Sequence, residues 1–276
     1  MSLLKRTISA LEKHAPLSLA ERSWDNVGLL AEAPIPRANA NKIFLTIDLT
    51  QETLLEAIQT PGVGVIISYH PPIFRALKQL TLADNKQNII LNSIAHGISI
   101  YSPHTALDSC LNGINDWIAS GLGPLKTCVP ITEKHDAPEG QEGSGKGRIC
   151  TLKEAVSFSE LVQRVKTHFK LEHVRIARAP QHFADDKSPS ISTIGICAGS
   201  GSTVLSGVKA DIYLTGEMSH HELLSATSDN TSVILCEHSN SERGYLAQVL
   251  RPVLLNALSD IEVLVSGIDK DPVEIV

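Results

Sequence analysis

The sequence contains no long hydrophobic run. Its longest apolar stretches, such as Gly62–Ser68 and Val263–Ser266, are far shorter than the roughly 20 residues that a membrane-spanning helix needs. The first residues also lack the apolar core of a secretory signal. A mitochondrial presequence would suit the basic Lys5 and Arg6, but the acidic Glu12 favours an ordinary first helix. We therefore expect a soluble, cytoplasmic protein, with the mitochondrion as the alternative location.

Cysteine is scarce and unpatterned. The five cysteines, at positions 110, 128, 150, 197 and 236, are odd in number and include no Cys-x-x-Cys pair. This pattern argues against a disulfide framework and against a zinc ribbon, and it suits a reducing compartment.

The chain also lacks an excess of positive charge. Its formal net charge is -6 and its pI is about 6.0, so nothing attracts it generally to phosphate backbones, and nucleic acid is an unlikely class of partner. With 276 residues, 42% hydrophobic and 20% charged, the chain is long and apolar enough for one large or two ordinary globular domains.

Segments typical of strands and helices alternate along the chain. Apolar runs at 42–48, 63–68 and 98–101 are separated by helical patterns at 50–59 and 85–96, which predicts a mainly parallel sheet with right-handed crossovers. A second αβ series follows residue 150. We expect an α/β fold with two domains.

Composition changes sharply once, in the Gly-rich and charged segment 133–147, which we expect to be a flexible linker beside a domain boundary. The last strand–helix–strand pattern, from residue 232 to 265, could complete either sheet. Its polar motif resembles those of the first half in chemical type. We therefore expect one domain at 1–130 plus 231–276, which would bind metal, and a second at 131–230.

Short polar segments follow several of the expected strands. They contain His70, the pair His104 and Asp108, and the pair His238 and Glu242. Both pairs have i, i+4 spacing, which lets two side chains on one helical turn reach one metal ion. Each feature has an ordinary alternative, namely helix capping for the pairs and a structural hydrogen bond for His70. Because three strand ends deliver histidine or histidine with carboxylate, we favour a shared divalent-metal site.

Three other segments are ambiguous. Trp24–Leu30 is either a turn packed under Trp24 or a wall of a site. The Gly-rich Ala198–Ser202 could bind phosphate, although a tight turn is the simpler interpretation. Glu217 and the following His220-His221-Glu222 offer further ligands or an acid/base group, or lie on a solvated helix face.

These motifs, in this order, resemble the Nif-three-like family (NGG-interacting factor three-like), whose members are often labelled GTP cyclohydrolase type 2 homologues. The resemblance covers essentially the whole chain, in the compact eukaryotic or fungal form, and rests on five motifs: Trp24–Leu30, Tyr69–Phe74, His104–Asp108, Thr215–Glu217 with His220–Glu222, and Glu237–Gly244. It implies two three-layer α/β/α domains with mainly parallel or mixed sheets. It also implies a ring-shaped hexamer of dimers, a homo-oligomer with a dinuclear metal site in each subunit.

Carried over by position, the metal ligands implied by the resemblance fall on His70, Asp108, His238 and Glu242, with His104 as a ligand or a supporting residue. The metal would be a divalent transition ion, Zn, Fe, Ni or Mn, with one or two ions per subunit. The chain departs from many members at Tyr69, where they have histidine. A phenol binds Zn or Fe(II) less readily than imidazole, so one of two ions could be weakly held or absent.

Two functions remain open from the sequence. The first is a metal-dependent hydrolase acting on a nucleotide or another small phosphoester-like molecule, with Glu217 as proton carrier. The alternative is a non-catalytic metal-binding or regulatory oligomer that binds a protein partner.

Overall fold

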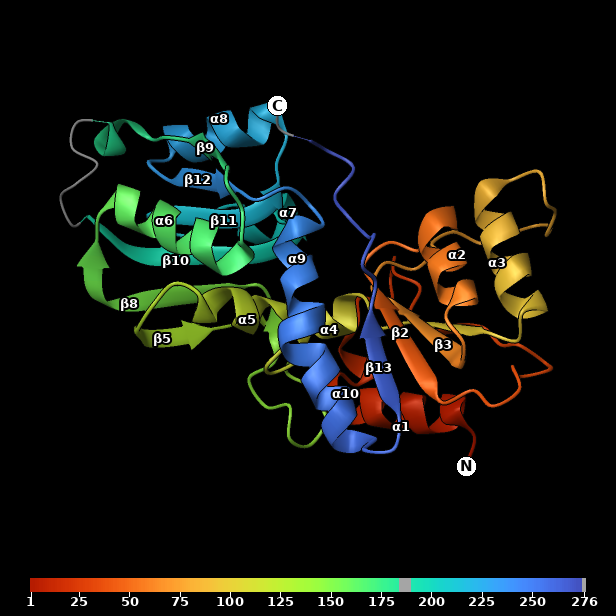
Figure 1. Ribbon diagram of the computed structural model, residues 1–276. Helices are drawn as coiled ribbons and strands as arrows, with labels where there is room; N and C mark the ends of the chain where they lie inside the picture. Colours follow the sequence, from red (N-terminus) through yellow and green to blue (C-terminus); the bar gives the residue numbers. More distant parts are fainter. Residues whose placement is uncertain (184–189, 275–276) are drawn as a thin grey trace. The chain divides into compact units, whose positions relative to one another are not determined.

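The computed structural model describes residues 1–183 and 190–274, which form two compact units (Figure 1). The first unit comprises Met1–Cys110 and Tyr245–Asp269, and the second comprises Leu111–Gly244 and Lys270–Val276. Each unit contains its own sheet with helices on both faces, so the expected α/β fold with two three-layer domains is confirmed. In the described ranges, no helix combines the length and the apolar character that crossing a membrane requires.

The sheet of the first unit has five strands in the order β1-β4-β3-β2-β13. The strands are β1 (Gly28–Ala31), β2 (Lys42–Thr46), β3 (Val63–Ser68), β4 (Ser99–Ser102) and β13 (Glu262–Val265). Four of them run parallel, and only β1 is antiparallel to its neighbour β4. The carboxyl ends of the parallel strands therefore meet at one edge, where polar segments follow β3 and β4.

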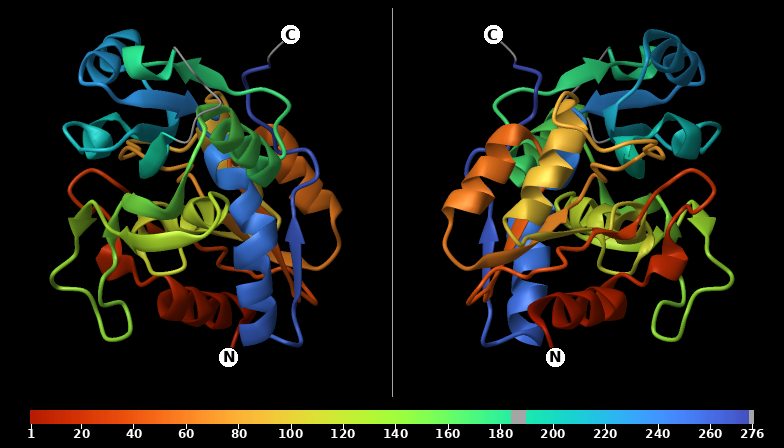
Figure 2. Two further views of the ribbon diagram at one scale, coloured as in Figure 1. Left: turned by 90° about the vertical axis from the view of Figure 1, so that its left-hand side faces the viewer. Right: turned by 90° about the vertical axis from the view of Figure 1, so that its right-hand side faces the viewer.

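Helices cover both faces of this sheet because its strands are apolar on both sides. Around the sheet the helices are α1 (Leu3–His14), α2 (Gln51–Gln59), α3 (Asn85–Ala95) and α10 (Arg251–Ala257), and the short α4 (Thr105–Ser109) follows β4. Phe44 and Ile66 belong to one buried cluster with residues of α2 and α3. The alternate residues Ile43 and Val65 are also buried, and α1 contacts both β3 and α10. Figure 2 shows α2 and α3 side by side.

The sheet of the second unit has six strands in the order β5-β8-β10-β11-β12-β9. The strands are β5 (Leu125–Val129), β8 (Arg148–Val156), β9 (Arg175–Ala177), β10 (Ile191–Ser200), β11 (Ile212–Glu217) and β12 (Ser232–Leu235). The central three, β10, β11 and β12, are parallel, and the outer three pair antiparallel. The sheet is mixed, and the polar motifs at Glu217 and His238 follow two of its parallel strands.

Helices also cover both faces of the second sheet. They are α5 (Ile114–Ser120), α6 (Phe158–Phe169), α7 (Ser202–Leu205) and α8 (His220–Ser228), and the short α9 (Asn240–Tyr245) follows β12. On one face, Leu205 of α7 and Ala226 of α8 pack with Tyr213 and Val233 of the strands. On α5, the Trp117 ring contacts the rings of two α6 residues, so α5 and α6 form a second helical layer.

The long helix expected near 241–258 is present but is not regular. Between α9 and α10 lies a π-helical turn, η3 (Leu246–Leu250). Pro252 lacks the N–H that a regular helix would direct at the carbonyl four residues earlier, and its ring crowds that carbonyl. A π turn that ends two residues before the proline accommodates both effects.

The division into units differs from the expected domain boundaries, 1–130 plus 231–276 against 131–230. The strand β5 pairs with β8, and β12 pairs with both β11 and β9, so both belong to the second sheet. Of the last strand–helix–strand pattern, residues 232–265, only the strand β13 joins the first sheet. The segment 133–147 lies within the second unit, where β6 (Thr132–Glu133) pairs with β7 (Gly145–Lys146), and marks no boundary.

Candidate metal site

In the first unit, His70 directly follows the end of β3. The backbone N–H groups of Tyr69 and His70 donate to carbonyls at the end of β2, and Pro71-Pro72 then directs the chain away. The His70 Nδ1 lies 2.9 Å from Asp48 Oδ1. Because a carboxylate only accepts, Nδ1 carries the proton, and Nε2 is the nitrogen with the lone pair that can bind a metal.

His104 follows the end of β4 and has the same arrangement. Its Nδ1 lies 2.7 Å from Asp25 Oδ1, and the Asp25 side chain is fully buried. Burial alone would raise the pKa of Asp25, but hydrogen bonds from His104 and Thr105 outweigh it and hold this pKa below its ordinary value. The backbone of His104 has a φ of 29°, which is strained for a residue other than glycine. The Asp25 contacts hold this strained residue in place.

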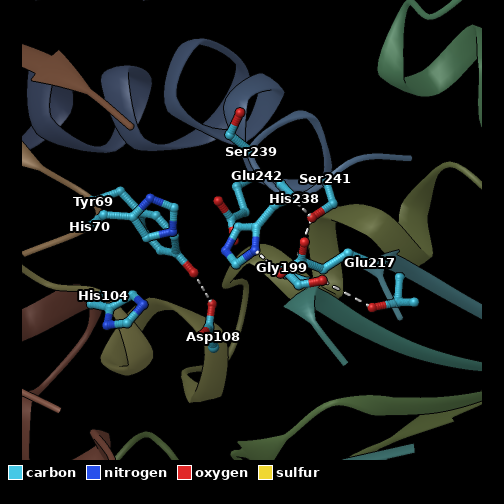
Figure 3. Close-up of polar contacts among 12 residues, drawn as sticks. Tyr69, His70, His104, Asp108, Gly199, Glu217, His238, Ser239, Ser241 and Glu242 are labelled. Carbon is cyan, nitrogen blue, oxygen red and sulfur yellow. Dashed lines mark hydrogen bonds and ion pairs between the residues drawn. The ribbon is translucent and has the colours of Figure 1, made fainter. Parts of the chain in front are cut away.

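Tyr69 and Asp108 form a third contact in the first unit. The buried Tyr69 hydroxyl donates to Asp108 Oδ1 at 2.5 Å. The Tyr69 ring also contacts the rings of His70 and His104, with centroids 4.9 Å and 5.3 Å away, and the two imidazole centroids are 5.4 Å apart. Figure 3 shows this Tyr69–Asp108 hydrogen bond together with the two histidines. The ends of β3 and β4 therefore bring four polar side chains into one cluster.

In the second unit, His238 and Glu242 lie where β12 gives way to α9. His238 Nδ1 is 2.8 Å from Glu217 Oε1, and its Nε2 is 3.6 Å from Glu242 Oε1. The Glu242 side chain is only 2% exposed, whereas His238 is 37% exposed. A buried carboxylate beside an imidazole nitrogen is a pair that could hold a divalent ion.

Glycine allows the backbone to approach this pair closely. Gly199 has a φ of +61°, and a Cβ there would lie 2.7 Å from Glu242 Oε1 and 3.0 Å from His238 Nε2. The Gly199 N–H donates to Ser241 Oγ at 2.8 Å, and the Ser241 hydroxyl donates to the His238 carbonyl at 2.7 Å (Figure 3). The Gly-rich segment 198–202 is therefore a wall beside His238 and Glu242.

The three candidate metal-binding histidines share one feature, which is a carboxylate beside Nδ1. The pairs are His70 with Asp48, His104 with Asp25, and His238 with Glu217. Metal-binding histidines commonly have such a partner, which fixes the tautomer and the ring orientation and makes the other nitrogen a better ligand. The chemistry of the donors therefore fits a divalent transition metal.

The sequence-predicted residues belong to both units. Tyr69, His70, His104 and Asp108 lie together in the first unit, and Glu217, His238 and Glu242 lie together in the second. The remaining candidates lie on α8. His220 and His221 are exposed on α8, and Glu222 accepts from the Ser219 N–H at the start of that helix, which is the ordinary capping alternative.

Sequence reasoning missed the carboxylate partners Asp25 and Asp48. Asp48 follows β2 at the same sheet edge as His70, so the strand-end argument could have included it. Asp25 lies in the Trp24 motif, whose second alternative, a wall of the site, is the nearer description of this residue. A third missed feature is Glu237, whose φ is +67° and whose carboxylate accepts from Arg175 Nε at 2.5 Å and Nη2 at 3.0 Å.

Fold and donor groups together define a two-unit α/β protein with candidate metal ligands at the ends of its strands. The family model described as Duf34/NIF3 (NGG1p interacting factor 3) matches residues 2–272, and the chain belongs to this family. This confirms the resemblance found in the sequence motifs.

Known relatives agree with this assignment. The chain is 45% identical to "Protein NIF3 homolog" of Schizosaccharomyces pombe over 258 residues, covering 91% of this chain and 90% of the relative. It is 36% identical to "NGG1-interacting factor 3" of Saccharomyces cerevisiae, covering 99% and 96%. Among solved structures, Staphylococcus aureus hypothetical protein SA1388 aligns with a TM-score of 0.79 at 26% identity, covering 99% of each chain.

Proposed function

We propose that this chain is a metal-dependent hydrolase. Its proposed metal ligands are His70, Asp108, His104, His238 and Glu242. Two imidazoles and a carboxylate, as in His70, His238 and Glu242, are donor types that could hold such an ion. The observation that carries the proposal is the carboxylate on Nδ1 of all three histidines.

Residues of the chain would set up the chemistry as follows. A divalent ion, when bound, would supply Lewis acidity and water activated near neutral pH, as hydrolysis of a nucleotide or phosphoester needs. Asp48, Asp25 and Glu217 would keep a proton on Nδ1 of each histidine and so keep Nε2 as the ligand atom. Glu217 is 49% exposed and is also the group that we propose takes up a proton released at the site.

Tyr69 favours one ion over two. Its hydroxyl donates to Asp108 at 2.5 Å. At position 69 the family resemblance implies a histidine, which would be a further imidazole ligand. A neutral phenol bound to a carboxylate competes with a metal for that oxygen and is itself a poor ligand for Zn or Fe(II). We propose that wild type holds one ion per subunit.

The second candidate function is a non-catalytic metal-binding oligomer that binds a protein partner. The observation that favours it is the name of the Saccharomyces cerevisiae relative, which describes that protein as interacting with NGG1. Self-association is part of both proposals. Light scattering would measure it as a mass that is a multiple of the 29.7 kDa protomer.

The test of the metal proposal is elemental analysis of protein grown in metal-supplemented medium and purified without chelator. Wild type should carry about one ion per subunit, and His238→Ala and Glu242→Ala should lose most of it while keeping their circular dichroism spectrum. His221→Ala, on the exposed face of α8, is the matched control and should retain the metal. Tyr69→His should raise the content toward two ions. Equally metal-free wild type and variants would contradict the proposal.

The test of the hydrolase proposal is a screen of the metal-loaded protein against nucleotides and phosphoesters. Turnover that depends on metal and is lost in His238→Ala supports the enzyme. A fully loaded protein that turns over no compound, yet retains a partner from a defined binding assay, supports the non-catalytic alternative. Metal content and turnover are measured on the same samples. A protein that fails to bind metal is therefore distinguished from one that binds metal but fails to hydrolyse any compound.

A further inference from the structure

Two cysteines of the second unit lie directly opposite each other on neighbouring strands. Cys128 of β5 is in register with Cys150 of β8, and their sulfur atoms are 2.9 Å apart, with both residues present as thiols. We propose that Cys128 and Cys150 are a redox-active dithiol that a low-molecular-weight disulfide converts reversibly into a cross-strand disulfide. This goes beyond the proposed function and does not depend on it.

The surroundings assign different roles to the two thiols. Cys128 is partly exposed, whereas Cys150 is buried and donates its S–H to Cys128. This hydrogen bond lowers the pKa of Cys128 below its ordinary value. The same contact, together with burial, raises the pKa of Cys150. Since the thiolate is the nucleophile, Cys128 is the attacking residue and Cys150 the resolving one.

The reaction balances as two thiol–disulfide exchanges. The Cys128 thiolate attacks one sulfur of the small disulfide, forms a mixed disulfide and expels one small thiolate. The charge on Cys128 that opposed ionisation of Cys150 is then gone. The Cys150 thiolate attacks the Cys128 sulfur and expels the second small thiolate. The two protein thiols are oxidised, the small disulfide is reduced to two thiols, and the two protons end on those thiols.

The other cysteines provide an internal comparison. Cys110, Cys197 and Cys236 are buried, and burial raises the pKa of Cys236. Buried thiols with a raised pKa react slowly with disulfides. The reaction should therefore select one pair among five cysteines.

The experiment treats reduced full-length protein with glutathione disulfide, blocks the remaining thiols and weighs the intact chain and its peptides. Wild type should lose two of its five thiols, carry no glutathione and yield a Cys128–Cys150 linked peptide. Cys150→Ser should instead retain one glutathione on Cys128, because the resolving thiol is gone. Cys128→Ser should keep its thiols. Cys110→Ala is the control and should still lose two.

Reduction with dithiothreitol should restore all five thiols of the wild type. The proposal is overturned if oxidised wild type keeps five thiols, if the linked peptide joins a different pair, or if glutathione attaches equally to Cys128→Ser and Cys150→Ser. The wild-type peptide map shows whether Cys128 and Cys150 form the disulfide, even if a serine variant fails to fold.

Discussion

Each candidate histidine has a carboxylate beside its Nδ1. A carboxylate on Nδ1 fixes the tautomer of His70, His104 and His238, at distances of 2.9, 2.7 and 2.8 Å. The partners differ in exposure, since Asp25 is fully buried and Glu217 is half exposed. Removing Glu217 therefore tests the arrangement with least damage to the fold.

Glu217→Ala should weaken metal binding about 10- to 100-fold, because His238 loses the group that orients it and raises its basicity. The measurement is metal affinity by competition with a chelator. Glu222→Ala is the matched control, because Glu222 caps α8 at Ser219 and contacts no candidate histidine in the described structure. Equal affinity of Glu217→Ala and wild type would mean that Glu217 does not orient the ligand.

Gly199→Ala should abolish metal binding, because its Cβ would lie 2.7 Å from Glu242 Oε1. Gly207→Ala is the control for backbone strain. Gly207 also has a positive φ, +76°, but nothing lies within 4 Å of its added Cβ. Both variants should lose roughly 1 kcal/mol of unfolding free energy, and only Gly199→Ala should lose the metal. Retained metal in Gly199→Ala would show that Gly199 does not wall the site.

At the scale of elements, strand ends position the candidate ligands. The sequence predicted that polar residues after β3, β4 and β12 would supply them, because alternation of strands and helices places carboxyl ends at one edge of a parallel sheet. The sequence placed residues 231–276 with the first domain, whereas β12 belongs to the second sheet. A buried run such as Ser232–Leu235 would have the same sequence pattern in either sheet. Only its pairing with β11 and β9 shows which sheet it joins.

The pairing of each histidine with its carboxylate also depends on contacts between elements. Asp25 and Asp48 are distant in sequence from His104 and His70, and only the fold brings them within hydrogen-bond distance. The i, i+4 pairs could be found because local helix geometry alone brings such side chains together. Local geometry is readable from the sequence, whereas contacts between elements depend on packing.

The junction of β8 with α5 rests on a buried ion pair. Arg148 is 2% exposed, and its guanidinium donates to Asp116 Oδ1 at 2.5 Å and Oδ2 at 3.0 Å. Asp116→Asn should destabilise the protein by about 3 kcal/mol, because it leaves a buried charge uncompensated. Urea denaturation measures this. Glu274→Gln, which breaks the exposed pair with Lys270, is the control and should cause no measurable change.

For the whole molecule, stability should fall on mild acidification. Burial lowers the pKa of His14, His168 and His182 below their ordinary 6.5. The unfolded chain therefore takes up protons first, so stability is full above about pH 6.5 and is lost as pH falls toward the lowered values. Thermal midpoints in chelator at about pH 7.5 and 5.5 test this. His14→Gln should flatten the decline, and the exposed His221→Gln should not.

Metal binding should stabilise the parts of the chain that hold the ion. An ion that binds only the folded protein stabilises every part that it contacts, by about 2.7 kcal/mol at a concentration 100 times Kd. If His70 and His238 are metal ligands, adding metal should slow hydrogen exchange near each of them. Hydrogen exchange measured by mass spectrometry reports each unit separately.

Alanine variants test each histidine separately. His70→Ala and His238→Ala should each lose the added protection near the substituted residue, because the ion has lost a ligand there. The exposed His221→Ala is the matched control and should keep the wild-type response. Undiminished protection in either His70→Ala or His238→Ala would mean that the substituted histidine does not bind the metal.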